Sequence, residues 1–271
     1  MRSFLAALLL ASAIPPGFAV AEIEQFFPAR DNTLCQDPDG LLSNGGGQYL
    51  FAGRTVQTES FSRRRALLQF DLTGAIPAGS KIISASLQMY MSRTSTSSAT
   101  VTLYRALADW GEGDSDALKE EGTGAPAAPG DATWIHRMYD DLLWNSPGGD
   151  FDPSESQSIT VVGLGNYTWS SNTAMVADVQ QWVDHPQSNF GWIVIGDEFI
   201  AQTAKRFNTR EHPDLTRRPV LVVEFVQPIP ASSTASILLL GIGLTWAAMI
   251  ILKRNSDARW NKKASVTGER R

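Results

Sequence analysis

Cysteine and histidine are scarce in this sequence, with one Cys and three His among 271 residues. A single cysteine cannot form an intrachain disulfide, so we expect Cys35 to be a small buried or half-buried residue. The sequence also lacks the G-x-S-x-G, H-E-x-x-H and P-loop patterns, which mark serine hydrolases, zinc peptidases and nucleotide-binding sites. It therefore carries no signature of these enzyme classes.

The composition has no extreme value either, with 43% hydrophobic residues, 22 Gly and 14 Pro. These totals exclude a disordered tail protein, a collagen-like fibre and a disulfide-rich miniprotein. The formal charge of −5 is a sum over segments that face different solvents, so its meaning depends on the two ends of the chain.

The first 21 residues predict a signal peptide. Arg2 precedes an apolar run over 4–13, and Ala19 and Ala21 have the A-x-A spacing that signal peptidase accepts. We expect cleavage after Ala21, which leaves an exported domain over 22–227. A buried N-terminal helix is the alternative.

Residues 235–252 are 18 residues without a charge, which predicts a transmembrane helix because roughly 17 to 25 apolar residues cross a bilayer. They follow a linker over 228–234 and precede a basic tail over 253–271, which favours a cytoplasmic C-terminus. We therefore expect an exported protein at the cell surface, on the extracellular side of a membrane, with a single-pass anchor. A buried core helix is the alternative.

The charge divides unevenly between these segments. The tail carries seven Lys and Arg against two acids and the signal peptide carries one Arg, so about −11 falls on residues 22–252. An acidic exported domain argues against nucleic acid as a partner, because phosphate binding needs a basic surface.

The exported domain has mostly a two-residue period. Apolar and polar side chains alternate over 66–72 and 85–92, and further strand candidates are 48–53, 100–107, 158–162, 191–195, 205–208 and 220–226. Met175, Val179, Trp182 and Val183 instead have helical spacing, after the capping candidate Asn172. This pattern predicts an all-β fold, an antiparallel β-sandwich of jelly-roll type with one short helix.

A long insert at about 114–157 interrupts that period. Its second half holds Trp134, Tyr139, Trp144 and Phe151. Aromatic residues at this density favour packing, so we expect this half to cover the sandwich as a lid or rim.

The order of several short motifs resembles the DNRLRE domain family. These motifs are DNTL at 31–34, RRALLQFDL, VTLYRALADWGEG, VADVQQWV, KRFNTRE and RPVLVVEF, and they span roughly 28–226. The resemblance implies an extracellular jelly-roll sandwich similar to carbohydrate-binding modules, some of which bind alginate-like acidic polysaccharide. The insert departs from the compact form of the family and could cover the implied ligand face.

The C-terminal segment is similar to PEP-CTERM sorting signals, because PIPASS at 228–233 precedes the apolar run and the basic tail. This resemblance implies a sorting peptidase of the exosortase type as a partner. The family's Pro-Glu-Pro is Pro-Ile-Pro here and the tail is longer than usual, so a plain membrane anchor stays an alternative.

Binding of a polysaccharide needs aromatic platforms, and an anionic one also needs cations. The candidates are Arg54, Arg63, Arg65, Lys205, Arg206, Arg210, Trp134 and Tyr139. The alternatives are ion pairs with the excess acids for the cations and core packing for the aromatic residues.

Calcium is the cofactor that we expect, with a structural role, because clustered carboxylate and amide oxygens suit this ion. The tentative ligands lie in two acidic loops, Asp31 and Asn32 in the first and Asp109 and Glu112 in the second. Neither loop has EF-hand spacing, and a solvated acidic loop is the alternative for each.

These features together predict a non-enzymatic module that binds extracellular polysaccharide or acts as a structural surface module. The alternative is a polysaccharide-degrading enzyme, a lyase or glycoside hydrolase, with its site in the insert. Asp131, His136, Tyr139 and Asp150 would then supply the acid and base.

Overall fold

The computed structural model describes residues 20–56, 61–95, 98–228, 249 and 253. Residues 20–228 form one compact unit. A second unit contains 1–19 and 229–271, of which only Met249 and Lys253 are described, both as helical. The predicted signal peptide, the transmembrane segment and the basic tail therefore lie almost entirely outside the described residues. None of the helices within the described ranges is long and apolar enough to cross a bilayer.

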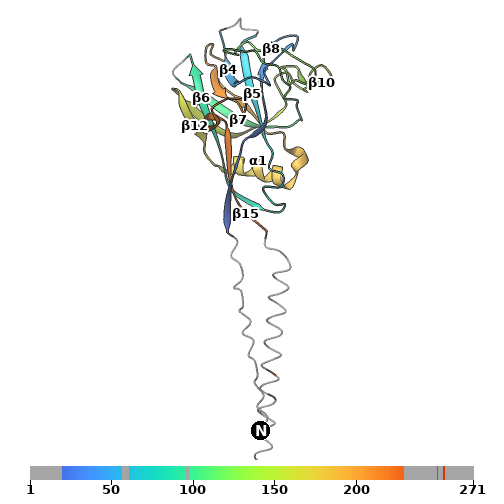
Figure 1. Cartoon of the computed structure of the whole chain (residues 1–271), viewed down its shortest axis with the longest axis vertical. Coiled ribbons are helices and arrows are strands. Elements are labelled where there is room, and N and C mark those ends of the chain that lie inside the picture. The colour runs from blue at the N-terminus through green and yellow to red at the C-terminus, as the bar shows by residue number, and fades with distance from the viewer. Residues whose placement is uncertain (1–19, 57–60, 96–97, 229–248, 250–252, 254–271) are drawn as a thin grey trace, which may run out of the picture. The chain divides into compact units, whose positions relative to one another are not determined.

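The compact unit is built around one large, curled, antiparallel sheet (Figure 1). Its eleven strands among the described residues run in the order β1-β15-β6-β14-β4-β5-β13-β7-β11, with β12 beside β6 and β2 beside β5. The strands are β1 Ala21–Phe26, β2 Pro28–Cys35, β4 Tyr49–Arg54, β5 Arg63–Phe70, β6 Lys81–Thr94, β7 Ala99–Ala106, β11 Phe151–Val161, β12 Gly165–Trp169, β13 Trp192–Ile195, β14 Lys205–Asn208 and β15 Val220–Val226. The expected mostly β, antiparallel architecture is confirmed.

Strand β4 connects the two halves of the curled sheet. Its residues Tyr49 to Ala52 pair with β14, whereas Gly53 and Arg54 pair with β5. The inward side chains of both halves meet in one core, which contains Leu68 of β5, Leu87 of β6 and Phe207 of β14. Burial of each such side chain stabilises the fold by about 1.5–3 kcal/mol, so the two halves hold each other in the curled shape.

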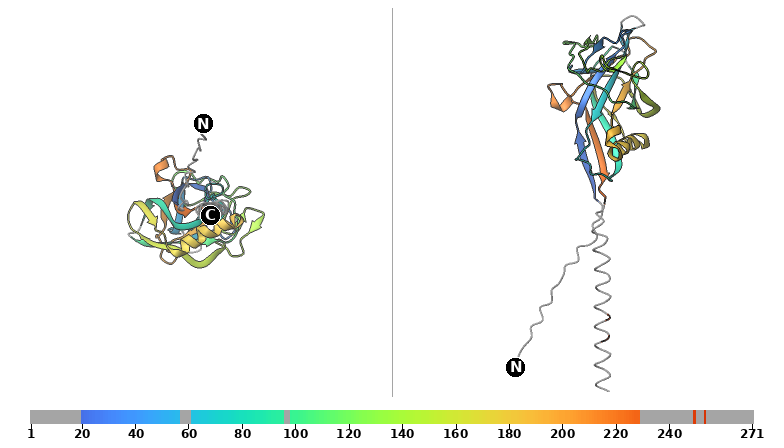
Figure 2. Two further views of the ribbon diagram at one scale, coloured as in Figure 1. Left: turned by 90° about the horizontal axis from the view of Figure 1, so that it is seen from below. Right: turned by 90° about the vertical axis from the view of Figure 1, so that its right-hand side faces the viewer.

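The helix α1 Thr173–Asp184 covers part of this core from one side, as Figure 2 shows. It begins where predicted, because the Asn172 side chain accepts a hydrogen bond from the Met175 N–H, and it ends at Asp184 with His185 as its C-cap, before Pro186. Its buried face is the predicted one, and Trp182 meets Trp192 of β13 edge to face at 4.6 Å between ring centroids.

Short elements fill the connections. They are β3 Leu42–Ser43, β8 Ala125–Pro126, β9 His136–Met138 and β10 Leu142–Leu143, with the 3-10 turns η2 Pro186–Ser188 and η3 Leu215–Arg217. Three of these strands lie in the insert, and β11 begins at Phe151, before the predicted end of the insert. Trp134 and Trp144 of the insert are buried in a second core cluster with Leu67 and Ile193, so the expected packing of its second half is confirmed.

Replacement of the helix cap gives a direct test of α1. We expect Asn172→Ala to lower the free energy of unfolding by about 1 kcal/mol, because the Met175 N–H at the helix start loses its acceptor. The exposed neighbour Thr173 is the control, and Thr173→Ala should change the free energy by less than about 0.5 kcal/mol. Chemical denaturation of both variants measures the difference; equal stabilities would contradict a capping role for Asn172.

Candidate functional site

The face of β5, β13 and β7 that points away from the main core presents charged, hydroxyl and aromatic side chains. Ile195 of β13 pairs with Arg65 of β5 and with Thr102 of β7, so these three side chains share one face. Alternation adds Arg63 and Tyr104 to the same face. Because the opposite face fills the core, this face is exposed wherever another element does not cover it.

The insert covers one end of this outer face. Leu67 and Ile193 lie there and are buried beneath Trp134 and Trp144 in the second core cluster. The other end, with Arg63 and Thr100, is left open. The insert therefore covers this outer face only in part.

A groove of about 710 Å³ occupies the open end. Its floor is formed by Thr100, Thr102 and Tyr104 of β7, and its wall by the loop over 196–200. Phe199 stands at the tip of that wall with 92% of its surface exposed.

Internal hydrogen bonds hold the wall in place. The Asp197 carboxylate accepts from the N–H groups of Phe199 and Ile200 at 2.8 and 3.1 Å, and the Thr203 hydroxyl is 2.6 Å from the Asp197 carbonyl oxygen. Arg54 also donates to the Phe199 carbonyl oxygen at 2.9 Å. The exposed aromatic ring therefore projects from an ordered loop.

Two arginines of β5 contact Glu198 of this loop, one closely and one at a longer distance. Arg65 binds Glu198 through two nitrogens, at 2.7 and 3.0 Å, and its guanidinium lies 4.9 Å from the centroid of the Trp134 ring. The Nε atom of Arg63 is 3.8 Å from Glu198, and 44% of the Arg63 side chain is exposed. Arg65 is thus a structural residue, whereas Arg63 offers an accessible cation at the edge of the groove.

The Tyr104 hydroxyl on the floor keeps its proton. Burial, and then the nearby Glu155 carboxylate, raise the pKa of Tyr104 above its ordinary value. The phenol donates a long hydrogen bond of 3.5 Å to the Glu155 carboxylate, so its oxygen faces the groove mainly as a hydrogen-bond acceptor.

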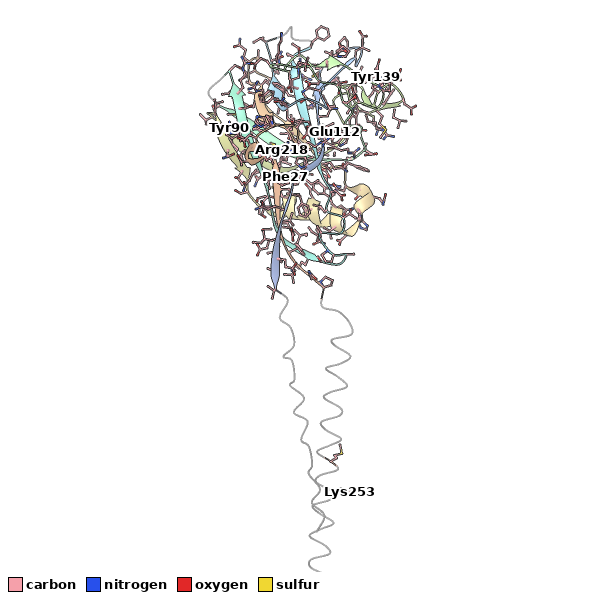
Figure 3. The ribbon with its side chains drawn as sticks, viewed as in Figure 1. Phe27, Tyr90, Glu112, Tyr139, Arg218 and Lys253 are labelled. Atoms are coloured by element: carbon pink, nitrogen blue, oxygen red, sulfur yellow. The ribbon has the colours of Figure 1, made fainter. Side chains whose placement is uncertain are left out.

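The other predicted ligand residues lie elsewhere and have partners within the protein. Lys205 is buried, donates to the Thr94 hydroxyl at 2.6 Å, and has its pKa lowered by burial. Arg206 lies 3.8 Å over the Tyr49 ring and pairs with Glu120. Trp134 is buried, and Tyr139 is half-buried beside His136 in the insert. Figure 3 shows Tyr139 well apart from Glu112.

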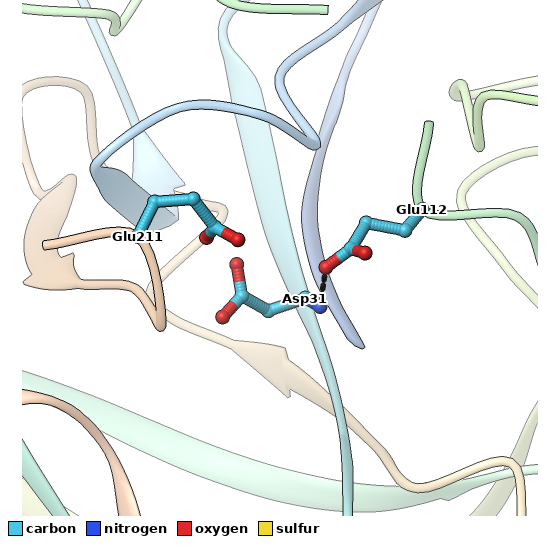
Figure 4. Close-up of side chains that lie close together, drawn as sticks. All are labelled: Asp31, Glu112 and Glu211. Atoms are coloured by element: carbon cyan, nitrogen blue, oxygen red, sulfur yellow. Dashed lines mark hydrogen bonds between the residues drawn. The ribbon is translucent and has the colours of Figure 1, made fainter. Parts of the chain in front are cut away.

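A second constellation is a group of carboxylates, Asp31, Glu112 and Glu211 (Figure 4). One oxygen atom from each residue lies within 4.8 Å of the others. Asp31 belongs to β2, Glu112 to the loop after β7 and Glu211 to the loop after β14. The fold therefore brings together three segments that are distant in sequence.

Arg210 binds all three members of this carboxylate cluster. Its guanidinium donates two hydrogen bonds of 2.7 Å to Glu112 and pairs with Glu211 at 2.9 Å, and its backbone N–H donates to Asp31 Oδ2 at 2.9 Å. Asp31 Oδ1 and Glu211 Oε2 are buried without a hydrogen-bond partner.

The carboxylate cluster is electrostatically unbalanced. Burial raises the pKa of Asp31 well above its usual range, Glu211 and Glu112 raise it further, and the Arg210 N–H lowers it in part. Burial also raises the pKa of Glu211, against the opposing effect of Arg210. One guanidinium thus faces three acids.

The predicted calcium ligands are only partly brought together. Asp31 and Glu112 meet, but Asn32 donates to the Ser43 hydroxyl and the Glu112 carbonyl oxygen, and Asp109 pairs with Arg30 at 2.8 Å. Glu211 is not among the predicted ligands, and it forms an ion pair with the adjacent Arg210. The sequence feature that could have indicated Glu211 is its place in the loop directly after the strand β14.

The residues of the enzymatic alternative stabilise local turns. Asp131 accepts from the Ala128 N–H at 2.7 Å, and Asp150 accepts from the N–H groups of Asn145 and Ser146 at 2.9 and 3.0 Å. His136 Nδ1 lies 3.2 Å from the Thr133 hydroxyl. Each group therefore has a role in the folding of the insert.

Comparison of the chain with protein-family models and with the curated proteins gave no match. The resemblances to the DNRLRE and PEP-CTERM families stay predictions that rest on the motifs quoted above.

The two arginines beside Glu198 provide a matched test of the wall of the groove. We expect Arg65→Lys to lower the free energy of unfolding by about 1–2 kcal/mol, because lysine cannot form the paired hydrogen bonds or the flat stacking contact. Arg63→Lys on the same face should change it by less than about 0.5 kcal/mol. Chemical denaturation of the full-length chain measures both; equal effects would contradict the division between a structural and an accessible arginine.

Proposed function

We propose that this chain is an exported surface protein whose curled sheet is a jelly-roll β-sandwich of the DNRLRE type, and that it binds an extracellular polysaccharide without cleaving it. Residues 1–21 direct export, and 235–252 either anchor the domain or belong to a sorting signal that a membrane peptidase recognises. The groove between β7 and the 196–200 loop is the binding site in this proposal.

The exposed Phe199 ring above a floor of hydroxyl groups is the observation that carries the proposal. Sugars present apolar C–H faces and a rim of hydroxyls, so they bind to aromatic rings with polar groups nearby. Thr100, Tyr104 and Arg63 supply those polar groups, whereas Thr102 is buried and its hydroxyl bonds that of Ser158. The groove volume of about 710 Å³ also lies within the range of small-molecule sites, roughly 300–1,000 Å³.

The charges in the groove favour a neutral polysaccharide. Arg63 and Arg65 are balanced by Asp197 and Glu198, and the exported domain as a whole is acidic. A polyanion would meet a repulsive field. The sequence left open whether the glycan is neutral or anionic, and most of the candidate cations are engaged within the protein.

The carboxylates of the groove support a non-catalytic role. Glycoside hydrolysis needs one carboxyl group to act as an acid and a second to act as a base or nucleophile. Asp197 is engaged by two backbone N–H groups, and Glu198 is held by Arg65. Both are therefore committed to holding the wall of the groove.

Binding is tested by affinity gel electrophoresis of the purified full-length protein in neutral glucan, mannan and xylan, with alginate as the anionic comparison. We expect retardation in at least one neutral gel. Phe199→Ala and Tyr104→Ala should each weaken binding by about three- to tenfold, the effect of one aromatic contact of about 0.5–1.5 kcal/mol. Phe27→Ala, which removes a phenylalanine that is 54% exposed and does not line the groove, should leave binding unchanged.

Absence of retardation in every neutral gel would refute the proposed binding. Retardation by alginate alone would overturn the assignment of a neutral ligand. Release of new reducing ends or unsaturated products during incubation would favour the enzymatic alternative instead.

A further inference from the structure

We propose that Asp31, Glu112 and Glu211 bind a calcium ion that fastens three distant segments of the chain to one another. The inference is independent of the polysaccharide site, because none of the three residues lines the groove.

The spacing of the carboxylate cluster fits this ion. Calcium binds oxygen at about 2.3–2.6 Å, so ligand atoms on opposite sides of one ion lie about 5 Å apart. One oxygen from each of the three residues lies within 4.8 Å of the others. Figure 4 shows the Asp31 carboxylate directed toward Glu211, with the Glu112 carboxylate beside the Asp31 backbone.

The unpartnered oxygens supply the second line of evidence. Asp31 is fully buried, and its Oδ1 atom has no hydrogen-bond donor; Glu211 Oε2 is also buried and without a donor. Buried polar atoms nearly always have a partner, because each one left without it costs about 1–3 kcal/mol. A cation between the carboxylates would satisfy both atoms at once.

The charge of the cluster also matches a divalent ion. Three carboxylates face one guanidinium, that of Arg210, which leaves two negative charges in excess when all three are ionised, the state that a bound cation favours. Buried charges in proteins are paired or bind metals. A monovalent ion would leave half of this excess uncompensated.

The type of ligand favours calcium over other divalent ions. Zinc and the later transition metals prefer His and Cys, whereas carboxylate oxygen suits calcium and magnesium. Magnesium demands near-octahedral geometry. The oxygens here come from three separate segments, one of them a strand, and calcium accepts such irregular arrangements.

Contacts within the protein hold the backbone of Glu112 in place without a bound ion. The Asn32 side chain donates to the Glu112 carbonyl oxygen at 2.7 Å. Gly45 packs so closely that a Cβ atom there would lie 1.8 Å from the same oxygen. These contacts hold Glu112 next to Asp31, so the ion would bind to a preformed set of ligands.

The proposal is tested on the purified full-length protein by thermal denaturation, first in EDTA and then in increasing CaCl₂, with isothermal titration calorimetry for stoichiometry. We expect one calcium ion per chain and a Tm at least about 4 °C higher in saturating calcium, since ligand binding to the folded state raises stability. Magnesium should produce a smaller shift at the same concentration. A wild-type protein that neither binds calcium nor shows the shift would overturn the proposal.

Asp31→Asn and Glu211→Gln should abolish the calcium-dependent shift. In EDTA, we expect Asp31→Asn to be at least as stable as the wild type, because it removes one of the excess charges, and this outcome distinguishes a metal ligand from a merely structural carboxylate. Asp109→Asn is the matched control. It alters an acid that pairs with Arg30 outside the cluster, and it should keep the full shift; its loss would contradict the assignment of ligands.

Discussion

The alternation of side chains along β5 is the constraint on which the rest of the domain depends. Ala66, Leu68 and Phe70 enter the main core, whereas Arg63, Arg65 and Leu67 point to the other face. A shift by one residue would exchange these two sets. On the second face, Leu67 is apolar and is buried by Trp134 and Trp144 of the insert. The part of this face that the insert does not cover forms the groove.

Ion pairs explain why several arginines that the sequence offered as ligand residues are engaged within the protein. Arg65 fixes Glu198, Arg105 fixes Asp178, and Arg210 fixes Glu112. Each pair joins segments far apart in sequence, and each carboxylate side chain is only 12–13% exposed. The Arg65 and Arg210 pairs are also bidentate, which fixes their geometry. The basic runs of the sequence are therefore mainly structural, with Arg63 as the accessible exception at the groove.

Period and capping were enough to predict the strands that have one buried face and one polar face. Strand β6, with Leu87 and Met89 inward, and α1, with its Asn172 cap, are examples. Strand β2 was not predicted, because it is buried on both faces from Asp31 to Cys35 and is polar at its centre. Glu211 was missed for another reason: local patterns do not report which distant loops meet.

The polar centre of β2 organises the loops around it. The Thr33 hydroxyl accepts from the Phe51 N–H, and Asn32 holds both Ser43 and the Glu112 carbonyl oxygen, so these two polar side chains are satisfied by neighbours. Asp31 differs, because only one of its oxygens has a donor. An asparagine could accept from the Arg210 N–H equally well without a buried charge. A carboxylate at this position gains stability when a cation meets its second oxygen, which is the role that we propose for calcium.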